Sequence, residues 1–232
     1  MKVVAIVLSL LAFIVCLVIG VQAGSQLQRQ KALQAAQPAT LINKDAQRTL
    51  LLIQVDDLSG DDPRLDGLSL LMYIPGHPML TFIPLFPAEI ARDGEMANRL
   101  AEAFSLDHNK ALSQAFTNAL KEEQIGWTGY ILSDRLGLAA LEAFLKDPSG
   151  FNGISDTIKK TNEADFNKDP ASTIPVYCSR VNDLQASLDW TRLLSALIPD
   201  HLHTDLGLEM LLSDWKNLSS PGLPFNCKVI TP

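Results

Sequence analysis

The stretch that decides the fold spans residues 48–87 and reads RTLLLIQVDDLSGDDPRLDGLSLLMYIPGHPMLTFIPLFP. Its first part, residues 49–55, is an unbroken apolar run, typical of a strand that is covered on both faces. Its last part holds two apolar runs on either side of a Pro-Gly-His-Pro turn at residues 75–78, which predicts a β-hairpin. Between them, residues 56–66 carry five aspartates and one arginine. Because ligand crevices of open α/β sheets lie at the carboxyl ends of strands, this acidic segment predicts one wall of an active site.

The rest of the chain alternates between helical and strand patterns. Apolar residues at helical spacing predict helices over residues 95–106, 109–123, 136–145, 184–197 and from an N-cap at Thr204 to residue 218. Short apolar runs predict strands over residues 129–133 and 174–178. Residues 151–172 are polar and are either a long loop or a loosely held helix and turn. We therefore expect a single α/β domain with helices flanking its central sheet, which is mixed because of the hairpin.

The N-terminus predicts export. Residues 3–21 contain no charged side chain, and about 20 apolar residues span a bilayer core, whereas signal-peptide cores have about 7–15. We expect an uncleaved, single-pass transmembrane helix. The sequence Val-Gln-Ala at residues 21–23 resembles a cleavage site and leaves a secreted domain as the alternative. The expected organisation is a membrane anchor or signal segment over residues 1–23, a stalk rich in Gln and Ala over 24–47 and an extracytoplasmic domain over 48–232.

Composition and cysteine usage exclude one class of partner and predict one crosslink. The 232 residues include 19 basic and 26 acidic side chains, a formal net charge of -7, which argues against the basic face that nucleic-acid binding requires. Cys178 and Cys227 form an even pair in the exported part, where oxidising conditions favour a disulfide. Two unpaired buried thiols are the alternative.

Several motifs within residues 48–197 follow one another in the order found in a known family. They are an apolar strand ending at Asp56, Arg64-Leu65-Asp66-Gly67 before the hairpin, Phe82-Ile83-Pro84-Leu85-Phe86 at its return, residues 99–104, and Arg180 ahead of a helix. On these motifs the chain resembles the LytR-CpsA-Psr family of bacterial envelope proteins. The resemblance implies an anchor, a stalk and an extracytoplasmic α/β domain at the bacterial cell membrane.

The resemblance also implies a function and a site. Family members transfer glycopolymers from a polyprenyl-pyrophosphate carrier to the cell wall, so a polyprenyl (pyro)phosphate lipid or a lipid-linked glycan is the expected partner. By resemblance, Asp56, Arg64 and Asp66 are catalytic, Asp56 and Asp66 hold Mg²⁺, and Arg64, Arg99 and Arg180 bind the substrate. Fixed cations suit a pyrophosphate leaving group, which gains negative charge as its bond breaks, and arginine binds phosphate oxygens in pairs.

The chain departs from the family's motifs at three places. Asp57-Leu58 stands where the family has an arginine after the first Asp, and Leu85 and Phe86 stand where it has an arginine and an aspartate after Pro84. In the late stretch, Asp183 stands at the position of the second arginine. A site with so few cations favours the alternative of a non-catalytic relative, a pseudoenzyme that binds a polyprenyl-linked lipid or a partner protein in the same cleft. Whether the protein is an enzyme stays open at this point.

For each candidate residue a structural interpretation stands beside the functional one. The acidic segment can be a surface loop in which Arg64 pairs with Asp66 or Asp62, and Leu85 and Phe86 can belong to the core. His201 and His203 lie two residues apart, but no Cys, Asp or Glu pattern completes a metal site, so we expect loop histidines. The sequence has no Gly-x-Ser-x-Gly nucleophile turn and no glycine-rich phosphate loop.

Overall fold

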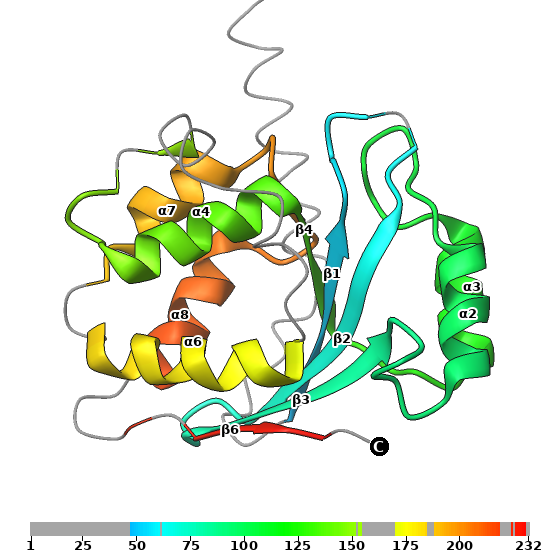
Figure 1. The fold of residues 1–232 in the computed structure, drawn as a ribbon, viewed down its shortest axis with the longest axis horizontal. Coiled ribbons are helices and arrows are strands. Elements are labelled where there is room, and N and C mark those ends of the chain that lie inside the picture. Colours follow the sequence, from blue (N-terminus) through cyan, green and yellow to red (C-terminus); the bar gives the residue numbers. More distant parts are fainter. Residues whose placement is uncertain are drawn as a thin grey trace, which may run out of the picture. The chain divides into compact units, whose positions relative to one another are not determined.

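The computed structural model describes residues 47–60, 62–151, 153–154, 170–184, 188–218, 224 and 226–230. They build an α/β domain around a six-stranded sheet with strand order β5-β4-β1-β2-β3-β6 (Figure 1). The strands are β1 (Arg48–Val55), β2 (Leu65–Tyr73), β3 (Met79–Phe86), β4 (Gly129–Asp134), β5 (Leu202–Thr204) and β6 (Asn226–Val229). The expected α/β domain with a mixed central sheet is confirmed.

The expected anchor over residues 1–23 and nearly all of the stalk lie outside the described residues. The boundaries that the sequence predicts there therefore stay predictions. Among the residues that the structure describes, no helix has the length and apolar character needed to cross a bilayer.

Strand directions create one edge at which several strands end. β1 pairs antiparallel with β2 and parallel with β4, and β2 pairs antiparallel with β3, so β1, β3 and β4 all run the same way. We call the edge where these three strands end, and where β2 and β5 begin, the carboxyl edge, and the opposite one the amino edge. The expected hairpin of β2 and β3 is present. Its turn uses Gly76 at a φ of +88°, a left-handed conformation that favours glycine.

Helices cover both faces of the sheet (Figure 1). One face carries α2 (Gly94–Ala103) and α3 (Gln114–Glu122); the other carries α4 (Arg135–Lys146), α6 (Pro170–Leu184), α7 (Trp190–Leu197) and α8 (Leu208–Leu218). On the α2–α3 face, Leu51, Ile53 and Val55 of β1 pack in one core cluster with Phe116 and Leu120 of α3. β1 also contributes Leu50 to a cluster that contains Trp215 of α8. Both faces of β1 are therefore buried, as its continuous apolar run predicts.

Side-chain caps set where several helices begin. Asp93, Ser113, Asp134 and Asp189 each accept a hydrogen bond from a backbone N–H in the first turn of α2, α3, α4 and α7, respectively. The helix that the sequence predicts from residue 109 therefore begins at Gln114, after its cap. The helix predicted over 184–197 likewise begins only at Trp190.

Two expectations for the C-terminal half are wrong. Residues 174–178, predicted as a strand because they form a short apolar run, lie inside α6. Tyr177 and Val181, one helical turn apart, pack against the cluster of α4 and α7, so tertiary packing overrides strand propensity there. Thr204 does not cap a helix. It ends β5, and its hydroxyl donates to the backbone oxygen of Tyr130 over 2.6 Å, while α8 begins at Leu208.

The C-terminal strand is joined to the helical layer. The structure links Cys178 of α6 to Cys227 of β6 through a disulfide with Cα atoms 6.2 Å apart. Cys227 stands opposite Leu80, near the start of β3, so the crosslink lies toward the amino edge of the sheet.

Candidate functional site

The register of the sheet brings the acidic segment together with residues that are distant in sequence. Val55, the last residue of β1, stands opposite Leu65 of β2 and Asp134 of β4. Asp66 is the extra residue of an irregularity in the β1–β2 pairing, a type of bulge that often redirects a side chain beside an active site. Neighbouring strands are about 5 Å apart, so side chains that follow these three positions lie at one place on the carboxyl edge.

The first polar pair at this edge is Asp56–Arg64. Arg64 Nε lies 2.9 Å from Asp56 Oδ2, and the backbone N–H groups of Arg64 and Asp57 donate to Oδ1 over 2.8 and 2.9 Å. Partial burial acts to raise the pKa of Asp56, but these hydrogen bonds from Arg64 and Asp57 outweigh it and hold that pKa below its ordinary value. The Arg64 side chain is 80% exposed, whereas that of Asp56 is 21% exposed. The carboxylate is therefore fixed while the guanidinium faces solvent.

The second pair is Asp66–Arg135. Arg135 donates from Nη2 to Asp66 Oδ1 over 2.9 Å and from Nε to Oδ2, a bidentate arrangement that fixes the plane of the guanidinium. Arg135 is the first residue of α4, directly after β4, and reaches across the end of β1 to β2. No sequence motif marked Arg135 as a site residue. Its position directly after the predicted strand over residues 129–133 could have identified it, because functional residues of such sheets lie where strands end.

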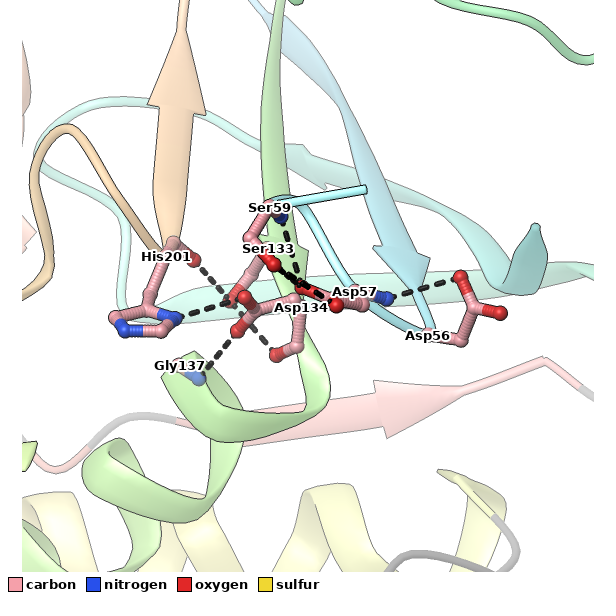
Figure 2. Close-up of polar contacts among 7 residues, drawn as sticks. All are labelled: Asp56, Asp57, Ser59, Ser133, Asp134, Gly137 and His201. Atoms are coloured by element: carbon pink, nitrogen blue, oxygen red, sulfur yellow. Dashed lines mark hydrogen bonds and ion pairs between the residues drawn. The ribbon is translucent and has the colours of Figure 1, made fainter. Parts of the chain in front are cut away.

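The loop that follows Asp56 is folded on itself and held from outside. Asp57 accepts hydrogen bonds from the backbone N–H of Ser59 over 2.8 Å and from its hydroxyl over 2.7 Å (Figure 2). Lys110, from the segment between α2 and α3, donates to the backbone oxygen of Gly60. These contacts bring a further cation to the acidic segment.

A third polar group lies at the end of β4 (Figure 2). The buried Asp134 carboxylate caps α4 by accepting from Gly137 N over 2.7 Å, and His201 Nδ1 lies 2.8 Å from its other oxygen. Ser133 Oγ donates to the backbone oxygen of His201 over 3.1 Å. His201 is a loop histidine, as expected, whereas His203 lies inside β5, so the expectation of two loop histidines is wrong for His203. No local pattern predicts the contact of His201 with a carboxylate 67 residues away.

A pocket opens at the carboxyl end of β3, the strand beyond β2. It has a volume of about 810 Å³ and is lined by Ile83, Pro84, Leu85, Asn98 and residues 92–96. Leu85 is buried and Phe86 packs against the same core cluster, which agrees with their interpretation as core residues. Leu85 additionally reaches the pocket wall. The pocket therefore combines an apolar wall with charged side chains from the start of α2.

Two predicted substrate-binding arginines lie elsewhere. Arg99 of α2 is half-exposed and pairs with Glu123, at the end of α3, over 2.7 Å. Arg180 is an exposed residue of α6, two positions after the disulfide cysteine Cys178, on the other face of the sheet. The structure does not bring either of them to Asp56, Arg64 and Asp66, and their binding of substrate stays a prediction.

Asp56 and Asp66 were also the expected Mg²⁺ ligands. Carboxylate oxygens suit Mg²⁺, but each of these carboxylates is already neutralised by a guanidinium, Asp66 through both of its oxygens. Within the described ranges, no three His, Cys, Asp or Glu side chains gather closely enough to hold a metal ion. This arrangement does not fit a resident Mg²⁺ ion, and Mg²⁺ binding stays a prediction.

Comparisons with known proteins give a match in fold. No family model matches the chain, and neither does any curated protein sequence. The solved structure of gbs0355 from Streptococcus agalactiae matches with a TM-score of 0.51 and 12% identity, covering 83% of this chain and 80% of that chain. A LytR-Csp2A-Psr enzyme from Actinomyces oris matches with a TM-score of 0.49 and 16% identity over 81% of both chains. A structure of TagT bound to LIIa-WTA matches with a TM-score of 0.47 and 11% identity, covering 81% of this chain and 79% of TagT.

At these identities the likeness concerns the fold alone, and the match to gbs0355, with its TM-score of 0.51, supports it. Structural neighbours of the chain, gbs0355 among them, are proteins of the LytR-CpsA-Psr family. The resemblance to that family is therefore confirmed at the level of the fold.

Proposed function

We propose that this protein is a divergent LytR-CpsA-Psr-type envelope protein that transfers a glycopolymer from a polyprenyl-pyrophosphate carrier to the cell wall. The observation that carries the proposal is the pair of Asp–Arg contacts at neighbouring strand ends, Asp56–Arg64 and Asp66–Arg135. Two guanidinium groups held at one edge of the sheet provide the fixed positive charge that a pyrophosphate requires.

The proposed reaction exchanges a phosphoanhydride bond for a phosphate ester bond. An acceptor hydroxyl attacks the phosphorus on the glycopolymer side, the anhydride P–O bond breaks, and the carrier leaves as a polyprenyl phosphate. Negative charge grows on the bridging oxygen as that bond breaks. Arg135 is oriented for this charge by its bidentate contact with Asp66. Arg64 can exchange Asp56 for a phosphate at little cost, because exposed ion pairs contribute only about 0–1 kcal/mol.

The pocket beside the edge supports a lipid-linked substrate. Ile83, Pro84 and Leu85 give it an apolar wall, and Arg92 supplies a cation among the residues that line it. We propose that the first isoprene units of the carrier lie along that wall while the pyrophosphate faces Arg64 and Arg135. The membrane placement of the protein, with its domain on the extracytoplasmic side, belongs to the same proposal, and secretion after signal cleavage is its alternative.

A non-catalytic relative is the second candidate. Leu85 and Phe86 are core side chains at the place where the family motif carries an arginine and an aspartate. In addition, both carboxylates that would act on the substrate are engaged by arginines. This arrangement favours a protein that binds a polyprenyl-linked lipid, or a partner protein, in the same cleft without turnover.

One assay separates the two candidates. Full-length protein in detergent is incubated with geranylgeranyl pyrophosphate, with and without Mg²⁺, and both lipid binding and release of inorganic phosphate are measured. Phosphate release that is lost in Arg135→Gln and kept in Lys146→Gln supports transfer chemistry at the carboxyl edge. Lys146→Gln is the matched control, because it also breaks a contact between a cation and a carboxylate, that of Lys146 with Glu142, but in the last turn of α4 and away from this edge. Binding without release supports the second candidate. No binding overturns both lipid-ligand proposals and leaves a structural or partner-binding domain. A dependence of release on Mg²⁺ tests the expected metal.

A further inference from the structure

One part of the sheet carries almost no charge. Residues 67–88, which contain most of β2, the hairpin turn and all of β3, include no Asp, Glu, Lys or Arg. β6 adds one charged residue, Lys228. In a chain whose net charge is -7, β3 and β6 together therefore carry one cation and no carboxylate.

The disulfide shows which side chains of β6 are exposed. Figure 1 shows β6 at the edge of the sheet, beside β3. Cys227 is bonded to Cys178 of α6, so it points to the layer of α4, α6, α7 and α8. Because side chains alternate between the faces along a strand, Asn226, Lys228 and Ile230 point to the other face, that of α2 and α3. All three are exposed, Ile230 to 40%.

β3 continues this exposed face as far as the pocket. Met79, the first residue of β3, stands opposite Asn226 and is 53% exposed. The backbone N–H of Ile230 donates to the carbonyl oxygen of Phe82 over 2.8 Å, which places Ile230 beside Ile83. Ile83 lines the pocket at the carboxyl end of β3. We call Met79, Ile83 and Ile230 the apolar strip, because they share one face and lead along the sheet to the pocket.

An apolar strip beside a lysine fits the surface of a lipid bilayer. Apolar side chains are favourable at the boundary between headgroups and acyl chains, and anionic headgroups attract a nearby lysine while they repel carboxylates. The acidic side chains at the pocket rim, Asp93 and Glu95, are accompanied there by Arg92. The strip also adjoins the pocket to which we assign the lipid carrier, which favours a bilayer over a partner protein.

We propose that the apolar strip and Lys228 rest on an anionic bilayer surface and that the lipid-linked substrate enters the pocket from there. The inference rests on the proposed function for its substrate and deepens it by naming the surface over which the carrier arrives. A polyprenyl chain that passes from the bilayer along the strip into the pocket keeps its apolar units out of water, which is favourable. The contact with the bilayer involves no substrate, so it is measurable apart from turnover.

The first measurement detects the contact directly. Full-length protein carries Cys16→Ser, so that a polarity-sensitive fluorophore reacts at one introduced cysteine, either Met79→Cys or the control Ile198→Cys. Ile198 is a matched control because it is also an exposed apolar residue, 39% exposed, but follows α7 in the other helical layer. The proteins are placed in vesicles of phosphatidylcholine and phosphatidylglycerol that contain lipid with a nitroxide on its acyl chain. The label at position 79 should be quenched and shifted to the blue, and the label at position 198 should be neither.

The charge of the surface is tested with Lys228→Glu. A basic residue beside an anionic surface contributes a factor of about five to the equilibrium, so the reversal should release the label at position 79 from quenching. In vesicles of phosphatidylcholine alone, the same substitution should change quenching little. Quenching at position 79 that ignores both Lys228 and the headgroup charge overturns the anionic bilayer as the partner. Equal quenching at both labelled positions overturns the inference, and no quenching at position 79 overturns it in favour of a partner protein on this face.

Turnover distinguishes this inference from the proposed function. The double variant Met79→Glu, Ile230→Glu should release phosphate from geranylgeranyl pyrophosphate at the wild-type rate in detergent, where the substrate reaches the pocket without a bilayer. In the anionic vesicles it should be slower by about fivefold or more, because carboxylates are repelled there. Equal rates of wild type and variant in the vesicles overturn the inference and leave the transfer reaction standing. Quenching at position 79 in a protein that releases no phosphate overturns the transfer reaction and leaves the bilayer contact standing.

Discussion

The two edges of the sheet use the same pair of residue types in opposite ways. At the amino edge, Arg48 Nε lies 2.9 Å from Asp214 Oδ2, and their side chains are only 18% and 8% exposed. Tyr73, at the end of β2, donates its hydroxyl to the same carboxylate over 2.7 Å. At the carboxyl edge, the arginines that pair with Asp56 and Asp66 are 80% and 41% exposed.

This difference separates a structural contact from one that can exchange partners. The Arg48–Asp214 contact is ionic rather than a directed hydrogen bond, because the Nε–H finds no well-aligned acceptor. Burial and the carboxylate of Asp214 raise the pKa of Tyr73, so its hydroxyl stays a donor. The amino edge is thus closed by groups that water and ligands cannot replace. At the carboxyl edge, solvent already reaches the guanidinium groups, so a phosphate can take the place of a carboxylate there.

The largest effect on stability should come from Asp214→Ala. The substitution leaves Arg48 as an uncompensated charge in a buried site and removes the partner of Tyr73, so we expect a loss of about 3–5 kcal/mol. Urea unfolding of the full-length protein in detergent, followed by far-ultraviolet circular dichroism, measures it. A loss below about 1 kcal/mol would mean that the pair behaves like a surface contact and that the two edges do not differ.

The next largest effect should come from removing the disulfide with Cys178→Ser and Cys227→Ser together. The crosslink closes a separation of 49 residues, and the loss of its constraint on the unfolded chain should cost about 2–4 kcal/mol. Because the crosslink lies toward the amino edge, binding of geranylgeranyl pyrophosphate should not change at a temperature where the variant is folded. Weakened binding under that condition would show that the edges are coupled.

Arg135→Gln should distinguish the carboxyl edge from the amino edge most clearly, because we expect it to lower activity strongly and stability only slightly. The Asp66–Arg135 contact is partly exposed, so the variant should lose no more than about 1 kcal/mol of stability. Loss of one oriented cation should lower phosphate release by about 100-fold. Unfolding curves and initial rates measured on one preparation test both. A large loss of stability with unchanged turnover would make Arg135 a structural residue like Arg48.

The sequence predicted the parts of this architecture that depend on local pattern. The apolar run of β1 and the Pro-Gly-His-Pro turn predicted a strand and a hairpin, and both are present because their side chains fill the cores on the two faces. The site depends on contacts between residues that are far apart in the sequence. Arg135 lies 69 residues from Asp66, and the pairing register of β1 and β4 brings them together. A local sequence pattern cannot predict such a contact. The helix at 174–178 escaped prediction for a related reason, since its packing partners in α4 and α7 are remote in sequence.

Arg64→Ala should have the smallest effect, and its pH dependence identifies the cause. The pKa of Asp56 lies below its ordinary value, so the pairing stabilises the fold above pH about 3.9 and loses that effect as pH falls through the folded pKa. At pH 7 the variant should be less stable by at most about 1 kcal/mol, because Arg64 is largely exposed. Urea midpoints between pH 7 and pH 3 should converge for wild type and variant, and NMR titration should show a higher Asp56 pKa in the variant. In an Asp56→Asn background the same substitution should change little. A difference that persists unchanged at pH 3 would mean that Arg64 acts through its aliphatic stem, in which case its charge would not be free to meet a phosphate without loss of fold.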